Sequence, residues 1–135
     1  MRASMTGASL PVSVSYSTKS LLSAALPLVL ALKRDGTVVA WGNNSERQCE
    51  IPPGLSNVVA VVSGNEFSLT LRQDGSVLAW GNSTFIQVPA GLSNVVAIAA
   101  GHLHSLVLKD DGTVVGWGQD AWGETLPPSG LSNVV

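Results

Sequence analysis

Two histidines, His102 and His104, are the residues whose types and spacing best suit chemistry. On an extended strand, side chains two residues apart lie on the same face, so the two imidazoles could together bind a metal ion. The sequence contains an internal repeat, however, and the residues equivalent to His104 in the two earlier copies are Phe67 and Leu28. A position that accepts Leu, Phe or His is most simply a packed core position. We therefore interpret His104 as structural and expect no metal site.

Carboxylates and a cysteine are the next candidates for catalytic or ligand-binding residues. Asp110 and Asp111 are adjacent, but the equivalent pairs are Arg34-Asp35 and Gln73-Asp74, a pattern typical of a turn rather than of an acid–base pair. Cys49 is the only cysteine, which excludes an intrachain disulfide and a site with several cysteine ligands. The sequence has no glycine-rich phosphate loop before a helix and no nucleophile elbow. We expect no enzyme activity, no catalytic residue and no cofactor.

The overall composition limits the classes of molecule that the chain is expected to bind. Of the 135 residues, 45% are hydrophobic and 12% are charged, which is typical of one ordered, strand-rich domain. Seven Lys and Arg residues stand against nine Asp and Glu residues, and the net charge is −2. The positive residues are scattered singly and form no stripe that would follow a phosphate backbone. We expect no binding to nucleic acid.

The N-terminal segment has the outline of a secretory signal, because Arg2 and Lys19 precede the apolar stretch 21–32. These twelve residues include Pro27 and are too few to span a bilayer, so we expect no membrane contact. The second half of the stretch coincides with a strand of the first repeat copy. We assign residues 1–27 to a divergent leader. The compartment is not determined, although the outline leans towards a secreted or extracellular bacterial protein.

One module of just under forty residues occurs three times. The segment GLSNVV begins at Gly54, Gly91 and Gly130, in steps of 37 and 39 residues. Asp-Gly and Trp-Gly dipeptides recur in a constant order, in steps of 39 and then 37 residues. Such a period is the signature of a repeat architecture. We interpret the following as structural repeat positions: Asp35, Gly36, Trp41, Gly42, Asp74, Gly75, Trp80, Gly81, His104, Asp111, Gly112, Trp117 and Gly118.

Each copy has the pattern of β-strands. Residues 58–62 form a continuous apolar run, typical of a strand buried on both faces, and residues 67–71 alternate between apolar and polar types. Residues 73–76 supply a hairpin turn and residues 77–80 the return strand. A proline cannot donate to a sheet ladder, so a short fourth, outer strand is expected before the prolines of Ile51-Pro52, Val88-Pro89 and Leu126-Pro127.

Four strands per copy, with no helical pattern between them, predict the blades of a β-propeller. The predicted fold class is all-β, a partial β-propeller of about three four-stranded antiparallel blades, either a fragment or closed by oligomerisation. The propeller repeats occupy residues 28–135. The copies lie at about 28–53, 54–90 and 91–129, and a fourth copy starts at 130–135.

The motif AAGHLHSLVLKDDGTVVGWG, with its small residues, His-Ser-Leu, Asp-Gly-Thr-Val and Trp-Gly, resembles the regulator-of-chromosome-condensation repeat family in its compact bacterial-type form. The resemblance covers about residues 28–135. It implies a propeller, usually of about seven blades, that acts through protein contacts on its faces. Guanine-nucleotide exchange, the activity of the best-known member, depends on one particular face and a longer ring, so we do not expect it here.

The segments after Trp-Gly differ most between copies, and variable loops on a rigid scaffold are where partners commonly bind. No tryptophan stands 37 or 39 positions before Trp122 in the third copy, and Phe85 and Arg47 lie in the same segment of the other copies. A large aromatic in such a loop is typical of a binding hot spot, and the alternative interpretation of Trp122 is that it caps the edge of the blade. We predict that Trp122, Phe85 and Arg47 bind a protein partner.

The predicted function is a non-enzymatic scaffold for protein–protein interaction, with a partner that the sequence does not identify. The first alternative is a structural module that forms a homo-oligomer by blade exchange. In that arrangement the terminal GLSNVV of one chain pairs into the first blade of another, and two chains close a six-bladed ring. The second alternative is a glycan-binding or inhibitor propeller.

Overall fold

The chain folds into β-strands joined by turns and loops. A computed structural model describes residues 2–3, 13–16 and 28–135, and within these residues it contains ten strands and no helix. The strands are β1 (Arg2–Ala3), β2 (Ser13–Tyr16), β3 (Leu28–Leu32), β4 (Val38–Gly42), β5 (Val58–Ser63), β6 (Phe67–Arg72), β7 (Val77–Gly81), β8 (Val95–Ala100), β9 (His104–Lys109) and β10 (Val114–Gly118). No helix that could cross a membrane is found in the described residues.

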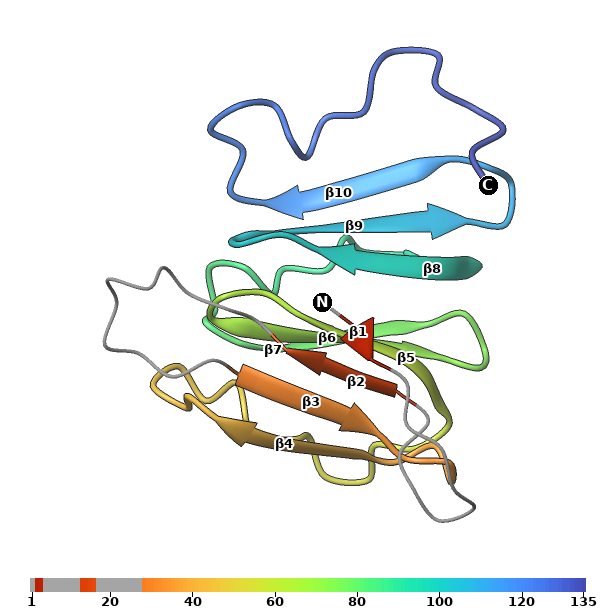
Figure 1. Cartoon of the computed structure of the whole chain (residues 1–135). Coiled ribbons are helices and arrows are strands. Elements are labelled where there is room, and N and C mark those ends of the chain that lie inside the picture. Colours follow the sequence, from red (N-terminus) through yellow and green to blue (C-terminus); the bar gives the residue numbers. More distant parts are fainter. Residues whose placement is uncertain (1, 4–12, 17–27) are drawn as a thin grey trace.

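The strands form three antiparallel sheets, which follow one another as layers in Figure 1. Blade 1 has the strand order β1-β2-β3-β4, blade 2 the order β5-β6-β7 and blade 3 the order β8-β9-β10. Each sheet holds one copy of the repeat, with consecutive strands paired. The predicted all-β partial propeller is therefore confirmed.

The Asp-Gly turns join the last two strands of each blade. In blade 2, Asp74 Oδ1 accepts hydrogen bonds from the backbone N–H of Ser76 (2.9 Å) and from its hydroxyl (2.6 Å). Gly75 follows the aspartate with a φ of +83°, a conformation that glycine adopts without steric cost. Asp35 and Asp111 make the same two bonds in the other blades. The repeated aspartates thus fix the geometry of each hairpin.

The hydrophobic core lies between blades. We call the side of a blade that is turned towards the next blade in the sequence its forward face, and the opposite side its rear face. The forward face of blade 1 contacts the rear face of blade 2 through Leu28, Leu30, Leu32 and Val38 on one side and Val58, Val61 and Trp80 on the other. The forward face of blade 2 contacts the rear face of blade 3 through Phe67, Leu69 and Leu71 on one side and Val95, Val107 and Trp117 on the other.

A backbone hydrogen bond from each GLSNVV segment links successive blades. The N–H of Val58 donates to the carbonyl of Gly36 (3.0 Å), and the N–H of Val95 donates to that of Gly75 (3.2 Å). A Cβ added to Gly75 would lie 3.3 Å from the backbone of Asn94, so the turn and the next segment are closely packed. The Asp-Gly turn of one blade therefore holds the start of the next.

The first strands of blades 2 and 3, β5 and β8, are less buried than their apolar runs predict. Val59 is 51% exposed and Val96 is 54% exposed, although both were expected in strands buried on both faces. The physical reason is a register shift in each strand, between Val58 and Ala60 in β5 and between Val95 and Ala97 in β8. The bulge leaves the intervening valine unpaired and changes its direction.

The predicted fourth, outer strand of each copy is wrong for the described residues. The segments that contain Ile51-Pro52, Val88-Pro89 and Leu126-Pro127 form turns and irregular loops. Because proline lacks the N–H that a ladder requires, these segments have little capacity to pair with β4, β7 or β10. Blades 2 and 3 consequently have three strands each.

Blade 1 begins earlier than the repeat motifs indicate. Strand β2 pairs with β3 antiparallel, with Ser13 opposite Leu32 and Tyr16 opposite Val29, and so takes the place that β5 and β8 have in their blades. No GLSNVV precedes β3, which is why the sequence pattern did not reveal this strand. Most of the predicted leader at residues 1–27 lies outside the described residues.

We expect Leu69→Ala to lower the free energy of unfolding by about 2–5 kcal/mol, because Leu69 is fully buried between blades 2 and 3 and its truncation leaves a cavity. Val59→Ala, a control in the same blade, removes part of a half-exposed side chain and should change that free energy by less than about 0.5 kcal/mol. Urea unfolding followed by tryptophan fluorescence measures both values. Equal losses would contradict a core that lies between the blades.

Candidate protein-binding loops

Three loops follow the Trp-Gly dipeptides. They comprise residues 43–54 after β4, residues 82–91 after β7 and residues 119–130 after β10, and we call them loops 1, 2 and 3. Each starts after the equivalent last strand of its blade, so the three loops start at the same end of their sheets. Figure 1 shows loop 3 extending beyond β10 on the outer side of blade 3.

Loops 1 and 3 share one conformation despite their different sequences. The side chain of Asn44 accepts a hydrogen bond from the N–H of Cys49 (2.8 Å), and Asp120 accepts the equivalent bond from the N–H of Thr125 (2.9 Å). Both loops contain one residue with positive φ at their tip, Arg47 (63°) in loop 1 and Gly123 (78°) in loop 3. The two loops can therefore be superposed position by position.

The shared conformation gives Trp122 a structural counterpart, which the sequence comparison missed. The N–H of Trp122 donates to the carboxylate of Glu124 (2.7 Å), and the N–H of Glu46 donates to the side-chain oxygen of Gln48 (2.8 Å). Trp122 thus corresponds to Glu46. The residue types give no sign of this match. The spacing does, because Gln48 and Glu124 each stand seven residues after the tryptophan of a Trp-Gly dipeptide.

Trp122 is the most solvent-exposed large apolar side chain on the three loops. It is 93% exposed, and Leu126 four residues later is 69% exposed. The turn that carries Trp122 is held by the bonds of Glu124 and Asp120 to backbone N–H groups, so the indole is presented on an ordered backbone. An exposed aromatic on an ordered turn loses little conformational entropy when it is buried by a partner.

The other two predicted partner-binding residues lie in different surroundings. Arg47 is exposed at the tip of loop 1, at the position next to the counterpart of Trp122. Phe85 in loop 2 is half-buried, and its ring lies 6.4 Å from that of Phe67 between centroids, at the junction of blades 2 and 3. Its position is explained by packing between the blades. The three residues belong to loops of three different blades.

Loop 1 also joins blades 1 and 2 through one backbone carbonyl. The carbonyl oxygen of Gln48 accepts a hydrogen bond from the hydroxyl of Ser68 (2.8 Å) and another from the indole N–H of Trp80 (2.8 Å). All three residues are buried, so these bonds satisfy polar groups that water cannot reach. The repeated tryptophan therefore has a polar role at this junction in addition to its packing role.

The equivalent residues at the next junction lack these bonds. Ser105 and Trp117 stand 37 residues after Ser68 and Trp80, yet the Ser105 hydroxyl and the Trp117 indole nitrogen have no hydrogen-bond partner among the described residues. Loop 2 is two residues shorter than loop 1 and places Phe85 and Ile86 at this junction instead. The two junctions thus differ in polar contacts while they share their apolar packing.

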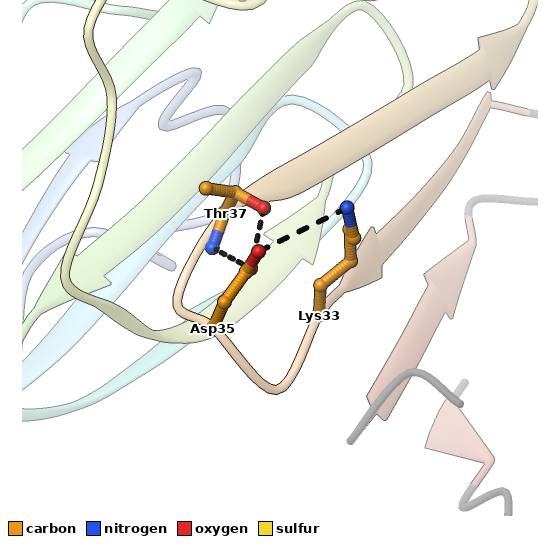
Figure 2. A network of polar contacts seen from close by, with 3 residues as sticks. All are labelled: Lys33, Asp35 and Thr37. Atoms are coloured by element: carbon orange, nitrogen blue, oxygen red, sulfur yellow. Dashed lines mark hydrogen bonds and ion pairs between the residues drawn. The ribbon is translucent and has the colours of Figure 1, made fainter. Parts of the chain in front are cut away.

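The aspartates of the turns have altered acidity. In blade 1, Thr37 donates its hydroxyl hydrogen bond (2.6 Å) and its backbone N–H (3.0 Å) to Asp35 Oδ1, as Figure 2 shows. The nitrogen of Lys33 lies 4.0 Å from the other carboxylate oxygen. The Thr37 hydroxyl, followed by its N–H, lowers the pKa of Asp35 below its ordinary value of 3.8. These contacts are those of a turn residue.

His104 and Cys49 are also explained by local packing. The ring of His104 lies over Gly101, where an added Cβ would clash with it, as the ring of Phe67 lies over Gly64. Partial burial raises the pKa of the Cys49 thiol, and its Sγ donates to the carbonyl of Asn43 (3.3 Å). Within the described part of the chain, no three His, Cys, Asp or Glu residues are grouped in a way that could hold a metal ion.

The repeats match a known family model. Residues 58–87 and 95–123 are each similar to the regulator of chromosome condensation (RCC1) repeat. These segments run from the start of β5 and of β8 into loops 2 and 3. No curated protein sequence has a significant match to the chain.

Thirty-eight chains of solved structures have a significant structural match to this chain. Prp20p from Saccharomyces cerevisiae has a TM-score of 0.56 and 25% identity over 68% of this chain, and yeast RCC1 (Prp20) bound to Kap60 has a TM-score of 0.60 and 27% identity over 78%. Human WBSCR16 has a TM-score of 0.59 and 23% identity over 79%. The matched region spans only 28% and 31% of the two yeast chains and 36% of the human one.

The unequal junctions lead to a prediction about stability. Ser68→Ala and Trp80→Phe each remove one hydrogen bond to the buried Gln48 carbonyl, and each should lower the free energy of unfolding by about 1–2 kcal/mol. Ser105→Ala and Trp117→Phe remove no protein hydrogen bond within the described residues and should lower it less. Urea unfolding of the four variants measures the difference. Larger losses at Ser105 and Trp117 would contradict the assigned role of Gln48.

Acid should weaken the three turns together. The pKa values of Asp35, Asp74 and Asp111 are lowered in the folded chain, first by the hydroxyl of Thr37, Ser76 or Thr113. A carboxylate with a lowered folded pKa stabilises the fold above its unfolded pKa and loses that contribution as the pH falls through the folded value. We expect the urea midpoint to fall as the pH drops below 3.8, the ordinary aspartate value. Asp74→Asn should flatten this pH dependence, and an unchanged slope would contradict it.

Proposed function

We propose that this chain, which carries regulator of chromosome condensation (RCC1) repeats in a partial β-propeller, is a non-enzymatic scaffold that binds a protein partner through its loops. The blades supply a rigid frame, because their core is formed by apolar residues from neighbouring blades. The loops after Trp-Gly supply the contact residues, and loop 3 supplies the principal one, Trp122.

The exposure of Trp122 on an ordered turn is the observation that carries this proposal. An indole that is 93% exposed in the unbound chain leaves its apolar surface in water. A partner that buries it gains hydrophobic free energy while the backbone beneath it is already ordered. Leu126 adds a second exposed apolar group on the same loop. Arg47 at the tip of loop 1 can supply a peripheral charge.

Similar propellers make protein contacts, which supports the same general role here. The structure of yeast RCC1 (Prp20) was determined with Kap60 bound, and Prp20p was studied for its binding to Gsp1p and histones. These partners belong to the yeast protein. We carry over only the principle that the fold acts through protein contacts, because this chain matches less than a third of each yeast chain.

Self-association is a second candidate function, and one observation favours it. The forward face of blade 3 contains an apolar groove lined by Ala97, Ala99, Leu106, Leu108 and Val114, among other residues. In blades 1 and 2 the forward face is covered by the next blade. The groove is therefore a surface of the kind that this chain buries between its blades.

The scaffold proposal is tested with Trp122→Ala. We expect the immobilised wild-type chain to retain a protein from a soluble extract of its own source organism, and the Trp122→Ala chain to retain much less. With the captured protein purified, biolayer interferometry should show about a 30-fold loss of affinity, because a hot-spot aromatic contributes about 2 kcal/mol or more. The urea midpoint should be unchanged, since the side chain is exposed.

Two further variants separate binding from folding. Val96→Ala is the matched control, because it shortens an exposed apolar side chain that lies outside the loops, and it should keep the affinity. Phe85→Ala should lower the urea midpoint, because Phe85 packs near Phe67 between blades 2 and 3. Full affinity in Trp122→Ala would refute the proposal that loop 3 makes the principal contact.

A further inference from the structure

Two buried polar groups lie at the junction of blades 2 and 3, which we call the second junction, and have no partner among the described residues. They are the hydroxyl of Ser105, which is 0% exposed, and the indole N–H of Trp117, which is 8% exposed. The two residues stand opposite each other in the ladder of β9 and β10. A buried donor without a partner destabilises a fold, so such groups almost always have one. The pair therefore indicates a binding site.

The equivalent pair in blade 2 indicates where these two donors point. Ser68 and Trp80 also stand opposite each other in their ladder. Both donate to the carbonyl oxygen of Gln48, each at 2.8 Å, so that one oxygen atom accepts both hydrogen bonds at the first junction. Ser105 and Trp117 stand 37 positions later, in strands that pair with the same register. We therefore expect their donors to converge on the equivalent point of the second junction.

Loop 2 does not bring a carbonyl oxygen to this point. Phe85 stands 37 positions after Gln48, but its N–H donates to the carbonyl of Asn82 (3.0 Å) and closes a turn. In loop 1 the equivalent turn is closed one residue before Gln48, by the N–H of Arg47, which donates to the carbonyl of Asn44 (3.2 Å). Because loop 2 is two residues shorter, Phe85 both closes the turn and enters the junction. Its carbonyl accepts a hydrogen bond from neither donor.

The chemistry of the second junction identifies its ligand. Two converging donors need an acceptor, and the side chains that pack at this junction are apolar, among them Val95, Val107 and Val115. An anion would lose its hydration there without a positive charge to compensate for the loss. A water molecule is neutral, accepts both hydrogen bonds and keeps two hydrogens for backbone carbonyls. Globular proteins hold about one buried water molecule per 27 residues, usually with about three hydrogen bonds, so such a ligand is ordinary in a chain of this size.

We infer that the second junction binds one water molecule, which accepts hydrogen bonds from the Ser105 hydroxyl and the Trp117 indole N–H. The water takes the place that the Gln48 carbonyl oxygen has at the first junction. It supplies the acceptor that the shorter loop 2 does not supply. The repeat can therefore keep its serine and tryptophan at fixed positions while the loop between two blades changes length. Bound water is the adaptor between a constant blade and a variable loop.

Nuclear magnetic resonance of the isotope-labelled whole chain tests this inference. The indole N–H of Trp117 should show a cross-peak at the water frequency, with opposite signs in NOESY and ROESY spectra, which is the signature of a bound water molecule. Trp80 is the matched control, because its indole also lies beside a serine hydroxyl but donates to a protein carbonyl. Its cross-peak with water should be absent or much weaker. The variants Trp117→Phe and Trp80→Phe assign the two indole resonances.

Exchanging the loop shows whether the water replaces the carbonyl. In this variant, residues 82–91 are replaced by the sequence of loop 1, residues 43–54, which brings the carbonyl of a glutamine to the second junction. We expect the cross-peak between the Trp117 indole and water to disappear, because the carbonyl takes both hydrogen bonds. Circular dichroism should show that the β-sheet spectrum is kept. Val59→Ala, which changes an exposed side chain on β5, should leave the cross-peak unchanged.

Several results would overturn the inference. They are a wild-type chain without a water cross-peak at Trp117, an equally strong cross-peak at Trp80, or a cross-peak that survives the loop exchange in a folded variant. A Trp117 indole resonance that shifts when sodium bromide is added would assign the site to an anion and would overturn it as well. If the variant with the exchanged loop does not fold, the comparison of Trp117 with Trp80 in the wild-type chain still decides the question.

Discussion

The packing of a forward face against a rear face is the interaction on which the rest of this structure depends. The strands within one blade satisfy the hydrogen bonds of their neighbours, but they do not cover the leucines of the middle strand. Leu69 in β6 is fully buried only because Val95, Val107 and Trp117 of the next blade lie near it. Stability in such a chain is therefore a property of junctions, as expected for architectures in which each repeat contacts mainly its neighbours.

Two kinds of polar contact align the apolar faces. The Asp-Gly turn presents a carbonyl to the next GLSNVV segment in all three copies, at 3.0 to 3.2 Å. The contact through the Gln48 carbonyl occurs only at the first junction, because loop 2 is shorter than loop 1. Apolar packing alone is tolerant of sliding, whereas a hydrogen bond has a defined distance and direction. The backbone contact is thus the constant element, and the side-chain contact varies with loop length.

The sequence predicted the recurring turns and central strands, and it failed where a structural feature has no signature in the residue types. The period, the turns and the central strands followed from Asp-Gly, Trp-Gly and GLSNVV. The bulge that exposes Val59 did not, because an apolar run gives no sign of a register shift. Strand β2 was missed because its residues share no motif with β5 and β8, the strands whose place it takes. The match between Trp122 and Glu46 was missed because the two residue types differ, although both residues stand five positions after the tryptophan of Trp-Gly.

Each loop contains residues that pack at a junction and residues that are exposed, and only the exposed residues can change without altering that packing. In loop 1, Gln48, Cys49 and Ile51 face the junction, while Arg47 lies at the exposed tip. In loop 2, Phe85, Ile86 and Val88 pack at the junction. In loop 3 the aromatic residue is exposed to solvent, and Trp122 takes the position next to the tip that Glu46 has in loop 1. A change at that position alters the exposed chemistry and leaves the hydrogen bonds that hold the turn in place. The repeat can therefore vary the exposed side chains of its loops one residue at a time without disturbing a junction.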